Sequence, residues 1–147
     1  MQRLLLRLIG VFEIAGGLFG LVAQIERLFP WGSMPDMISA LVGIVLFALL
    51  LVAGVLLLEH HAAGTRLSRW LQLAQLPVIG TSFFSYALYA GVRLDLDVVI
   101  QRPLSLLIHA DIGRWHWLLA LAGPHNWHLG INLVALAALG ILRWKRA

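Results

Sequence analysis

Cysteine is absent from this chain of 147 residues. Disulfide frameworks, thiolate metal sites and cysteine nucleophiles are therefore excluded. Charge is also scarce, because 12% of the residues are charged and 61% are hydrophobic, against about 25% and about 45–50% in average soluble domains. So few charged residues leave too little polar surface to cover a water-soluble globule. The composition therefore predicts a membrane protein, and the length allows a single domain over residues 1–147.

Signature motifs of common enzymes are missing too. The chain contains no G-x-x-x-x-G-K-[ST], G-x-G-x-x-G or G-x-S-x-G sequence, so the usual nucleotide-binding and serine-hydrolase signatures are excluded. The net charge of +4 comes from small basic clusters beside apolar segments, which is typical of membrane orientation and not of nucleic-acid binding. We expect no cofactor and no nucleic-acid partner, and these absences favour a non-enzymatic protein.

Long apolar segments are what the sequence does have. A membrane-spanning helix needs about 20 mostly apolar residues, and four segments approach this length: 4–25, 37–59, 70–91 and 124–143. Neighbouring helices can accommodate a proline such as Pro77 in the third segment. Pro124 suits the first position of the fourth. The sequence therefore predicts an all-α membrane protein, a four-helix transmembrane bundle.

The charges predict how this bundle is oriented. One side of the predicted bundle carries a net charge of +6 from Glu59 and seven basic residues: Arg3, Arg7, Arg66, Arg69, Arg143, Lys145 and Arg146. The other side carries −1, from Glu26, Arg27, Asp36, Arg93, Asp95, Asp97, Arg102, Asp111 and Arg114. Positive loops stay in the cytoplasm. We therefore expect a multi-pass protein of the inner membrane with both termini cytoplasmic.

The segment 92–121 between the third and fourth predicted helices has a different pattern. Apolar and polar residues alternate in "VRLDLDVVI", and the alternation resumes in "LSLLIHA" and "RWHWLLAL" after short breaks. Period-two alternation between turns is typical of β-strands. It predicts a small three-stranded β-meander on the extracytoplasmic side, with Asp95 and Asp97 on its solvated face. An interfacial amphipathic helix over part of this segment is the alternative.

Glu13 is the one acidic residue in the interior of a predicted span, because Glu59 is the last residue of the second. Helical spacing places it on the same face as Gly10, Gly17 and Gly20, and small residues allow helices to approach closely in lipid. We therefore predict that these glycines pack against protein and that Glu13 points into the bundle. The predicted polar intramembrane cluster contains Glu13, Gln72, Gln75, Ser82, Tyr86 and Asn132.

Two interpretations of Glu13 remain open. The carboxyl can fix helix register through hydrogen bonds, or it can belong to a functional site, as ionisable residues at this depth often do. His125 and His128 are spaced i, i+3 and are the only candidates for metal ligands that we single out. Because H-x-x-H without a neighbouring glutamate is a weak motif, we predict no metal site.

These observations lead to one main function hypothesis and two alternatives. The first is a non-enzymatic membrane protein that associates with itself or with a partner protein in the lipid bilayer. It would do so through the glycine-lined helix faces and the outer β-sheet. The second is a small oligomeric channel or carrier with a polar path at Glu13, Gln72 and Gln75. A metal-dependent membrane enzyme is a remote third.

Overall fold

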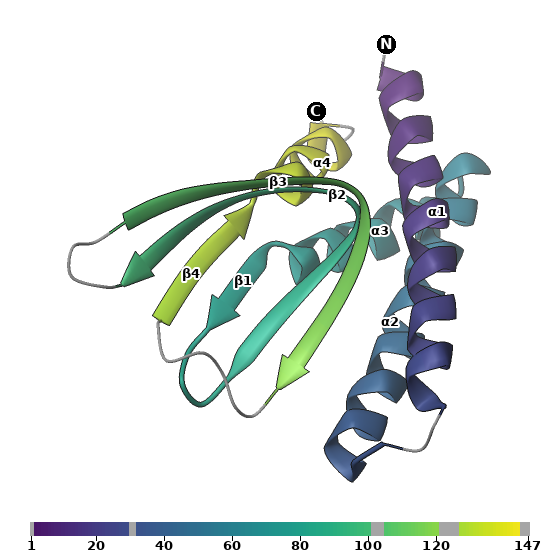
Figure 1. Ribbon diagram of the computed structural model, residues 1–147. Coiled ribbons are helices and arrows are strands. Elements are labelled where there is room, and N and C mark those ends of the chain that lie inside the picture. Colours follow the sequence, from purple (N-terminus) through teal and green to yellow (C-terminus); the bar gives the residue numbers. More distant parts are fainter. Residues whose placement is uncertain (1, 30–31, 101–104, 121–126, 145–147) are drawn as a thin grey trace.

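The computed structural model describes residues 2–29, 32–100, 105–120 and 127–144. They form four helices and one four-stranded antiparallel sheet (Figure 1). The elements in chain order are α1 (Gln2–Leu28), α2 (Met34–Leu58), α3 (Ala62–Gln75), β1 (Pro77–Gly80), β2 (Ser85–Ile100), β3 (Ser105–Ala120), β4 (Trp127–Asn132) and α4 (Leu133–Trp144). The fold is mixed α/β, so the predicted all-α four-helix bundle is wrong.

Helices α1 and α2 form an antiparallel hairpin that stands along one side of the molecule (Figure 1). The Ser33 side chain begins α2 by accepting a hydrogen bond from the backbone N–H of Asp36 at 3.4 Å, a typical N-cap contact. Glycines bring the two helices together. A Cβ atom added at Gly10 would lie 3.0 Å from the carbonyl oxygen of Gly54. One added at Gly17 would lie 2.7 Å from the backbone nitrogen of Leu51 in α2.

The third predicted helix, over residues 70–91, is wrong because the chain changes structure at Pro77. α3 ends at Gln75, and β1 begins at Pro77. Proline has no N–H to continue a helix, and the residues after it are rich in β-branched and aromatic types, which favour strands. A turn between β1 and β2 then reverses the chain, with the N–H of Thr81 donating to the carbonyl oxygen of Phe84 at 2.8 Å.

The fourth predicted helix, over residues 124–143, is also wrong over 127–132, and residues 124–126 lie outside the described residues. Residues Trp127–Asn132 form β4, and α4 starts only at Leu133. Asn132 caps this helix, because its side-chain oxygen accepts hydrogen bonds from the backbone N–H groups of Val134 and Ala135 at 3.0 and 3.3 Å. The 12 residues of α4 extend about 18 Å, too short for a hydrocarbon core of about 30 Å.

The sheet curls around its two short strands. Its strand order is β1-β4-β2-β3, and β1 also pairs with the start of β2. The long strand β2 therefore contacts β1 at Tyr86 and β4 from Asp95 onward, and the β2–β3 hairpin arches over both (Figure 1). The pairing register shifts between Gly91 and Val92, and such a bulge increases the local bend of a strand.

The predicted three-stranded meander over 92–121 is replaced by this arrangement. β2 begins at Ser85, seven residues before the predicted start, and β3 is a single strand through the position where a turn was predicted. Residues 105–120 are extended, so the amphipathic-helix alternative is wrong for them. The rest of the predicted segment, 101–104 and 121, lies outside the described residues.

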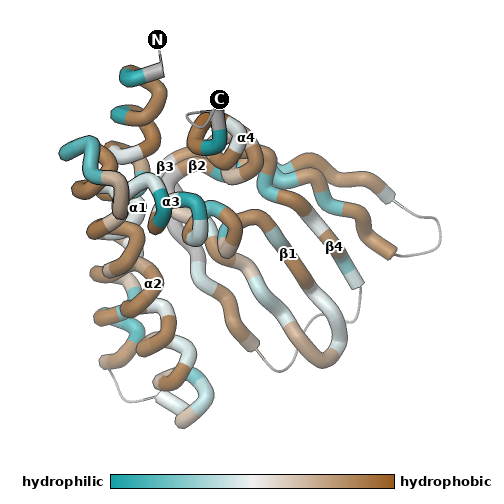
Figure 2. Tube along the Cα trace, turned by 180° about the vertical axis from the view of Figure 1, so that it is seen from behind, coloured by the Kyte–Doolittle hydropathy of each residue, from teal (hydrophilic) through white to brown (hydrophobic). Residues whose placement is uncertain are grey.

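The main core lies where the helical hairpin meets the bend of the sheet. Phe47, Leu50, Leu71, Leu88 and Trp117 are all buried there. The indole N–H of Trp117 donates to the carbonyl oxygen of Ser39 at 2.7 Å. Hydrophobic residues also predominate along α1 and α2 (Figure 2), and many of them are exposed. Two helices, Arg3–Leu28 and Met34–Leu58, are long and apolar enough to cross a membrane.

Candidate functional site

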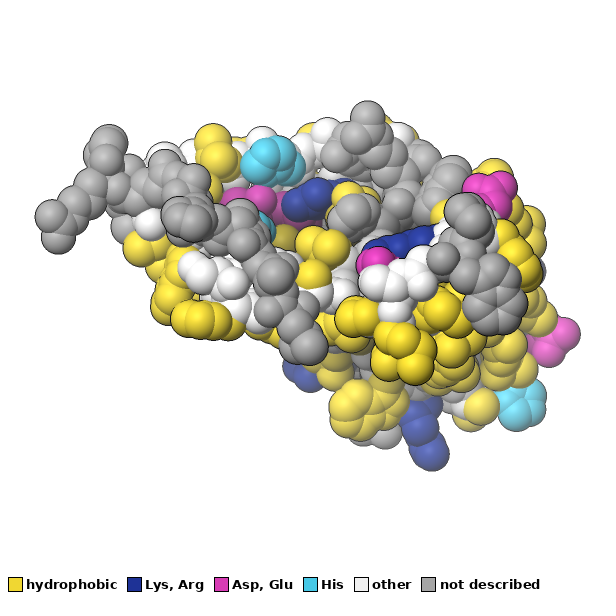
Figure 3. Space-filling model, turned by 60° about the horizontal axis from the view of Figure 1, so that its bottom comes forward, with side chains coloured by type: hydrophobic (Ala, Val, Ile, Leu, Met, Phe, Trp, Pro, Cys, Tyr) yellow, Lys and Arg dark blue, Asp and Glu magenta, His cyan; other side chains and the backbone are white. Residues whose placement is uncertain are grey.

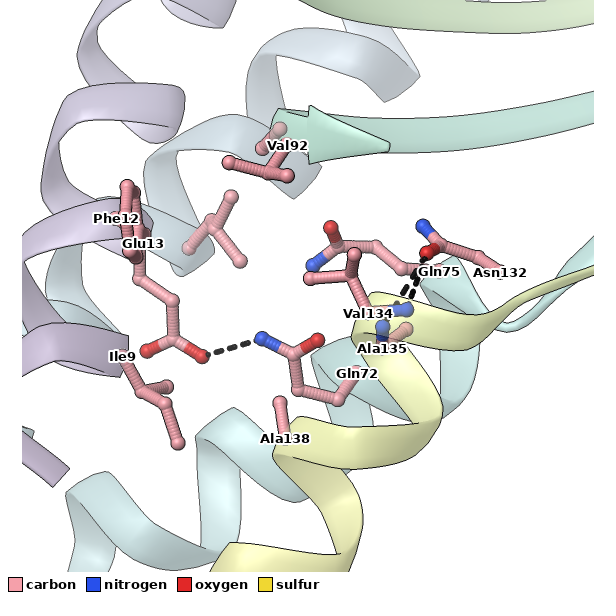
Figure 4. Close-up of a pocket in the computed structure, with 12 residues that line it drawn as sticks. Ile9, Phe12, Glu13, Gln72, Gln75, Val92, Asn132, Val134, Ala135 and Ala138 are labelled. Carbon is pink, nitrogen blue, oxygen red and sulfur yellow. Dashed lines mark hydrogen bonds between the residues drawn. The ribbon is translucent and has the colours of Figure 1, made fainter. Parts of the chain in front are cut away.

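The Glu13 side chain lies in the middle of α1 and is only 2% exposed. Its carboxylate oxygens accept two hydrogen bonds from α3, from the Ser68 hydroxyl at 2.7 Å and from the Gln72 amide nitrogen at 3.0 Å. The two donors are four residues apart, so they share one face of α3. This face of α3 therefore presents both hydrogen-bond donors to the buried acid of α1, and Figure 4 shows the bond from Gln72.

Beside this carboxyl lies a cavity of about 230 Å³ at the meeting point of α1, α3, α4 and β2 (Figure 4). Its polar lining consists of Glu13, Gln72, Gln75 and Asn132. Eight apolar residues form the rest of the lining: Ile9, Phe12, Leu50, Ala90, Val92, Val134, Ala135 and Ala138. A mostly apolar concave site with a few convergent polar groups is the common form of a small-molecule site.

Gln75 contributes an unused hydrogen-bond donor to this cavity. Its side chain is 4% exposed, and its amide nitrogen has no hydrogen-bond partner among the described residues. The amide end extends from α3 toward the side of the cavity where Glu13 and Gln72 lie (Figure 4). The side-chain oxygen of Asn132 is occupied by the cap of α4. A buried donor without an acceptor costs about 1–3 kcal/mol, and a bound ligand with an acceptor group would remove that cost.

Comparison with protein-family models, with curated proteins and with solved structures finds no match to this chain. Function must therefore be argued from the site itself, its geometry and its chemistry. The cavity beside Glu13 brings together four of the six residues of the predicted polar cluster.

The other two residues of that cluster lie elsewhere. The hydroxyl of Tyr86 donates to the carbonyl oxygen of Ala74 at 2.6 Å, near the end of α3. Ser82 lies in the turn after β1 and accepts a hydrogen bond from the indole nitrogen of Trp127 at 3.0 Å. A continuous helix over 70–91 would align these residues with Gln72 and Gln75, whereas the break at Pro77 separates them.

Ser68 is the hydrogen-bond donor that sequence reasoning missed. It precedes Gln72 by one helical turn and is fully buried. The predicted third helix began at residue 70, and so Ser68 was excluded from the polar face. A helix started at Ala62 would have placed it there.

The glycines singled out in the sequence, and one of the two histidines, pack against other parts of the same chain. Gly10, Gly17 and Gly20 of α1 contact α2 within the same chain, so this face is not open to a partner. The ring of His128 lies against Gly80 of the paired strand β1, where a Cβ atom would come within 1.9 Å of it. His125 lies outside the described residues. Within 2–29, 32–100, 105–120 and 127–144, no three His, Cys, Asp or Glu side chains are placed to hold a metal ion.

A second polar cluster lies in the curled sheet. Asp95 and Asp97, predicted to be solvated, are 0% and 4% exposed. Arg93 forms a salt bridge with Asp95 and lies 3.9 Å from the carboxylate of Asp97. The imidazole of His109 on β3 lies 3.0 Å from the same carboxylate. Figure 3 shows acidic, basic and histidine side chains gathered in a hollow at the lower end of the molecule.

Arg93 offsets part of the negative charge of this cluster. Burial raises the pKa of Asp95, and the hydrogen bond and charge of Arg93 oppose that rise. Arg93 also lies over the ring of Tyr89, with 4.6 Å between the guanidinium carbon and the ring centroid. The side chain of Asp97 occupies the space over Gly130 of β4, where a Cβ atom would lie 1.7 Å from its Oδ1. The cluster thus joins β2, β3 and β4, and we assign it a structural role.

Proposed function

We propose that this chain is a non-enzymatic membrane protein that binds a small amphiphilic molecule in the cavity beside Glu13. The observation that carries the proposal is the buried, unpartnered amide nitrogen of Gln75 in the wall of a largely apolar cavity. Most buried polar groups in proteins have a hydrogen-bond partner, and an acceptor on a ligand in this cavity would supply one to Gln75.

Exposed apolar side chains support the placement in a membrane. Both long helices have large hydrophobic residues on their outer sides, among them Val11, Phe19, Val22, Val45 and Val52, each between 45% and 58% exposed. The 27 and 25 residues of α1 and α2 extend roughly 40 Å, which exceeds a hydrocarbon core of about 30 Å. Water-soluble monomers rarely expose apolar patches this large, whereas lipid covers them without cost.

Charge supports one orientation of this hairpin. Arg3 and Arg7 lie at the start of α1, and Arg66 follows the end of α2. The N-terminal end of α1 and the C-terminal end of α4 lie toward the same end of the molecule (Figure 1). By the positive-inside rule, the proposal places both termini in the cytoplasm and the short α1–α2 connection outside. In a bacterium this membrane would be the inner one.

The lining indicates the chemistry of the ligand. Gln75 offers an N–H donor, and the Glu13 carboxyl offers acceptor oxygens. The ligand would therefore have an acceptor and a donor close together, as in an amide or alcohol. An apolar cavity of about 150 Å³ is enough for benzene, and this one has about 230 Å³. Phe12 lines the cavity and is 49% exposed, and the proposal places the entrance for the ligand beside it, on the lipid side.

Binding is favoured over conduction by the distribution of the polar residues. A channel or carrier needs polar groups that continue along the path of the solute. Glu13, Gln72 and Gln75 surround one cavity, whereas Ser82 and Tyr86 bond to groups outside it. The proposal therefore takes this cluster as a binding site.

The test uses para-fluorobenzamide as the probe, with fluorine NMR on the protein in detergent micelles. Gln75→Leu removes the free donor and should weaken probe binding about tenfold, the value of one good hydrogen bond. Gln24→Leu is the matched control, because Gln24 is also buried but does not line the cavity. Equal binding to both variants and the wild type would refute the proposal. So would equal binding of para-fluorotoluene, which has no polar group.

Self-association through β3 is a second candidate, supported by a different observation. Within the described residues, β3 pairs only with β2, which leaves one edge without a strand partner. Leu106, Ile108 and Ile112 on this strand are 60%, 66% and 85% exposed. An unpaired edge is a template for another strand, and its backbone groups need partners wherever water is excluded.

Light scattering of the protein–detergent particle tests this candidate. We expect a dimer for the wild type and a monomer for Ile108→Lys, because a lysine on an edge strand opposes pairing. Leu129→Lys adds the same charge to the interior strand β4 at a residue that is 50% exposed, and it should leave the dimer intact. A monomeric wild type would eliminate this candidate.

A further inference from the structure

A basic groove lies between α3 and α4. It is lined by Arg66, Arg69, Trp70, Leu73, Leu139 and Arg143, and it has a volume of about 720 Å³. The groove shares no lining residue with the cavity. It brings three arginines from two helices together without a nearby acid in its lining.

The residues of α3 in the groove follow the order of a membrane interface. Along one exposed face, Arg66 comes first, then Trp70 one turn later, then Leu73. Charged residues belong at the headgroups, tryptophan at the boundary and leucine in the hydrocarbon. Trp70 is 68% exposed, so its ring is available to a molecule in the groove.

The residues of α4 repeat this order in the opposite chain direction. Leu139 precedes Arg143 by one turn, and Arg143 is in the last turn of the helix. The basic ends of both helices therefore lie at the same level, because the side chain of Arg69 on α3 donates to the carbonyl oxygen of Leu142 on α4, from Nε at 3.1 Å. A second bond from the same guanidinium reaches the same carbonyl. Arg69 thus uses two of its five N–H donors to join the helices and keeps the others for a ligand.

We propose that this groove binds one anionic phospholipid. Arg66, Arg69 and Arg143 would hold the phosphate group, and Trp70 would lie beside the glycerol. The acyl chains would cover Leu73, with the buried Leu139 beneath them. Arginine suits this role because its planar donors match phosphate oxygens. The inference rests on the membrane placement proposed above, and it does not depend on the ligand of the Glu13 cavity.

The test is native mass spectrometry of the protein released from nanodiscs of phosphatidylcholine and phosphatidylglycerol. The wild type should retain one phosphatidylglycerol. The double variant Arg66→Gln, Arg143→Gln should bind it about 25-fold more weakly, because each arginine near an anionic surface contributes about fivefold. The matched control, Arg3→Gln with Arg7→Gln, removes two exposed charges from the same end of the molecule and should retain the lipid.

Several results would overturn the proposal. Equal losses in the two double variants would mean diffuse attraction to the bilayer and not a site. Equal retention of phosphatidylcholine would mean that the phosphate charge is not recognised. Displacement of the lipid by inorganic phosphate alone, with Trp70→Ala unaffected, would identify a free phosphate as the ligand.

The outcome for the cavity is separable from this one. Gln75→Leu should lose the amide probe and keep phosphatidylglycerol, and the arginine variants should do the reverse. A wild type that does not enter nanodiscs would refute both the membrane placement and the lipid site.

Discussion

Removal of the Glu13 carboxyl tests whether this side chain holds α1 to α3. In Glu13→Ala, the Ser68 hydroxyl and the Gln72 amide lose the acceptor that the structure gives them. Two buried donors left without a partner cost about 2 kcal/mol at the low end of the known range. Loss of the buried Cγ methylene adds about 0.8 kcal/mol. The free energy of unfolding should therefore fall by about 3 kcal/mol.

Glu13→Gln separates the hydrogen bonds from the charge. Glutamine has the same shape and keeps one acceptor oxygen, and the Ser68 hydroxyl can rotate to accept from the new amide nitrogen. We expect a loss of about 1 kcal/mol or less, since interhelical hydrogen bonds in membranes average about 0.6 kcal/mol. Glu26→Ala is the control on the same helix. Glu26 is exposed, so its removal should change stability by less than about 0.5 kcal/mol.

Reversible unfolding in mixed micelles provides the assay, followed by the fluorescence of the six tryptophans. A Glu13→Ala variant as stable as the control would refute the reasoning, because the carboxyl would then make no net contact with α3. A Glu13→Gln variant as unstable as Glu13→Ala would show that the charge matters and the shape does not.

Three further predictions address the packing and the sheet. Gly17→Ala should lower the free energy of unfolding, measured by thermal unfolding, because its methyl would lie 2.7 Å from the backbone nitrogen of Leu51 in α2. Gly140→Ala should raise this free energy by about 0.5–1 kcal/mol, since nothing lies within 4 Å of that site. Because burial raises the pKa of Asp95, the folded state holds its proton more tightly than the unfolded state. Stability should fall as pH rises above the ordinary value of 3.8, and chemical unfolding of Asp95→Asn should lack this slope. Trp117→Phe removes the hydrogen bond to Ser39 and should cost about 1 kcal/mol, measured by thermal unfolding; no change would contradict the contact.

Helical periodicity in the sequence predicted most of the polar residues that line the cavity. At 3.6 residues per turn, Glu13 lies on the glycine face of the first helix, and Gln72 and Gln75 share one face of the third. The structure places all three around one cavity. Asn132 joins them for another reason, because it ends β4 and caps α4. The sequence pattern found this residue on a helix face, whereas the fold places it at a strand–helix junction.

A local sequence pattern could not predict strands β1 and β4. Short apolar runs suit a buried helix and a buried strand equally. Because the whole chain is hydrophobic, the sequences of β1 and β4 resemble parts of membrane-spanning helices. Pairing decides between them: Val78 lies opposite Gly130, and Ile79 lies opposite Leu129. These partners are about fifty residues apart in the chain, and no single segment contains that information.

The sequence by itself determined the two long apolar helices of this protein. Each helix depends on the composition of one continuous segment and on the spacing of the residues within it, so the local sequence is enough to predict it. Only the tertiary structure decided that Asp95 and Asp97 are buried with Arg93, and that Ser68 reaches Glu13 across 55 positions. Desolvation and hydrogen-bond pairing depend on which surfaces meet, and they meet here because β2 bends and pairs with β1 at one end and with β4 at the other.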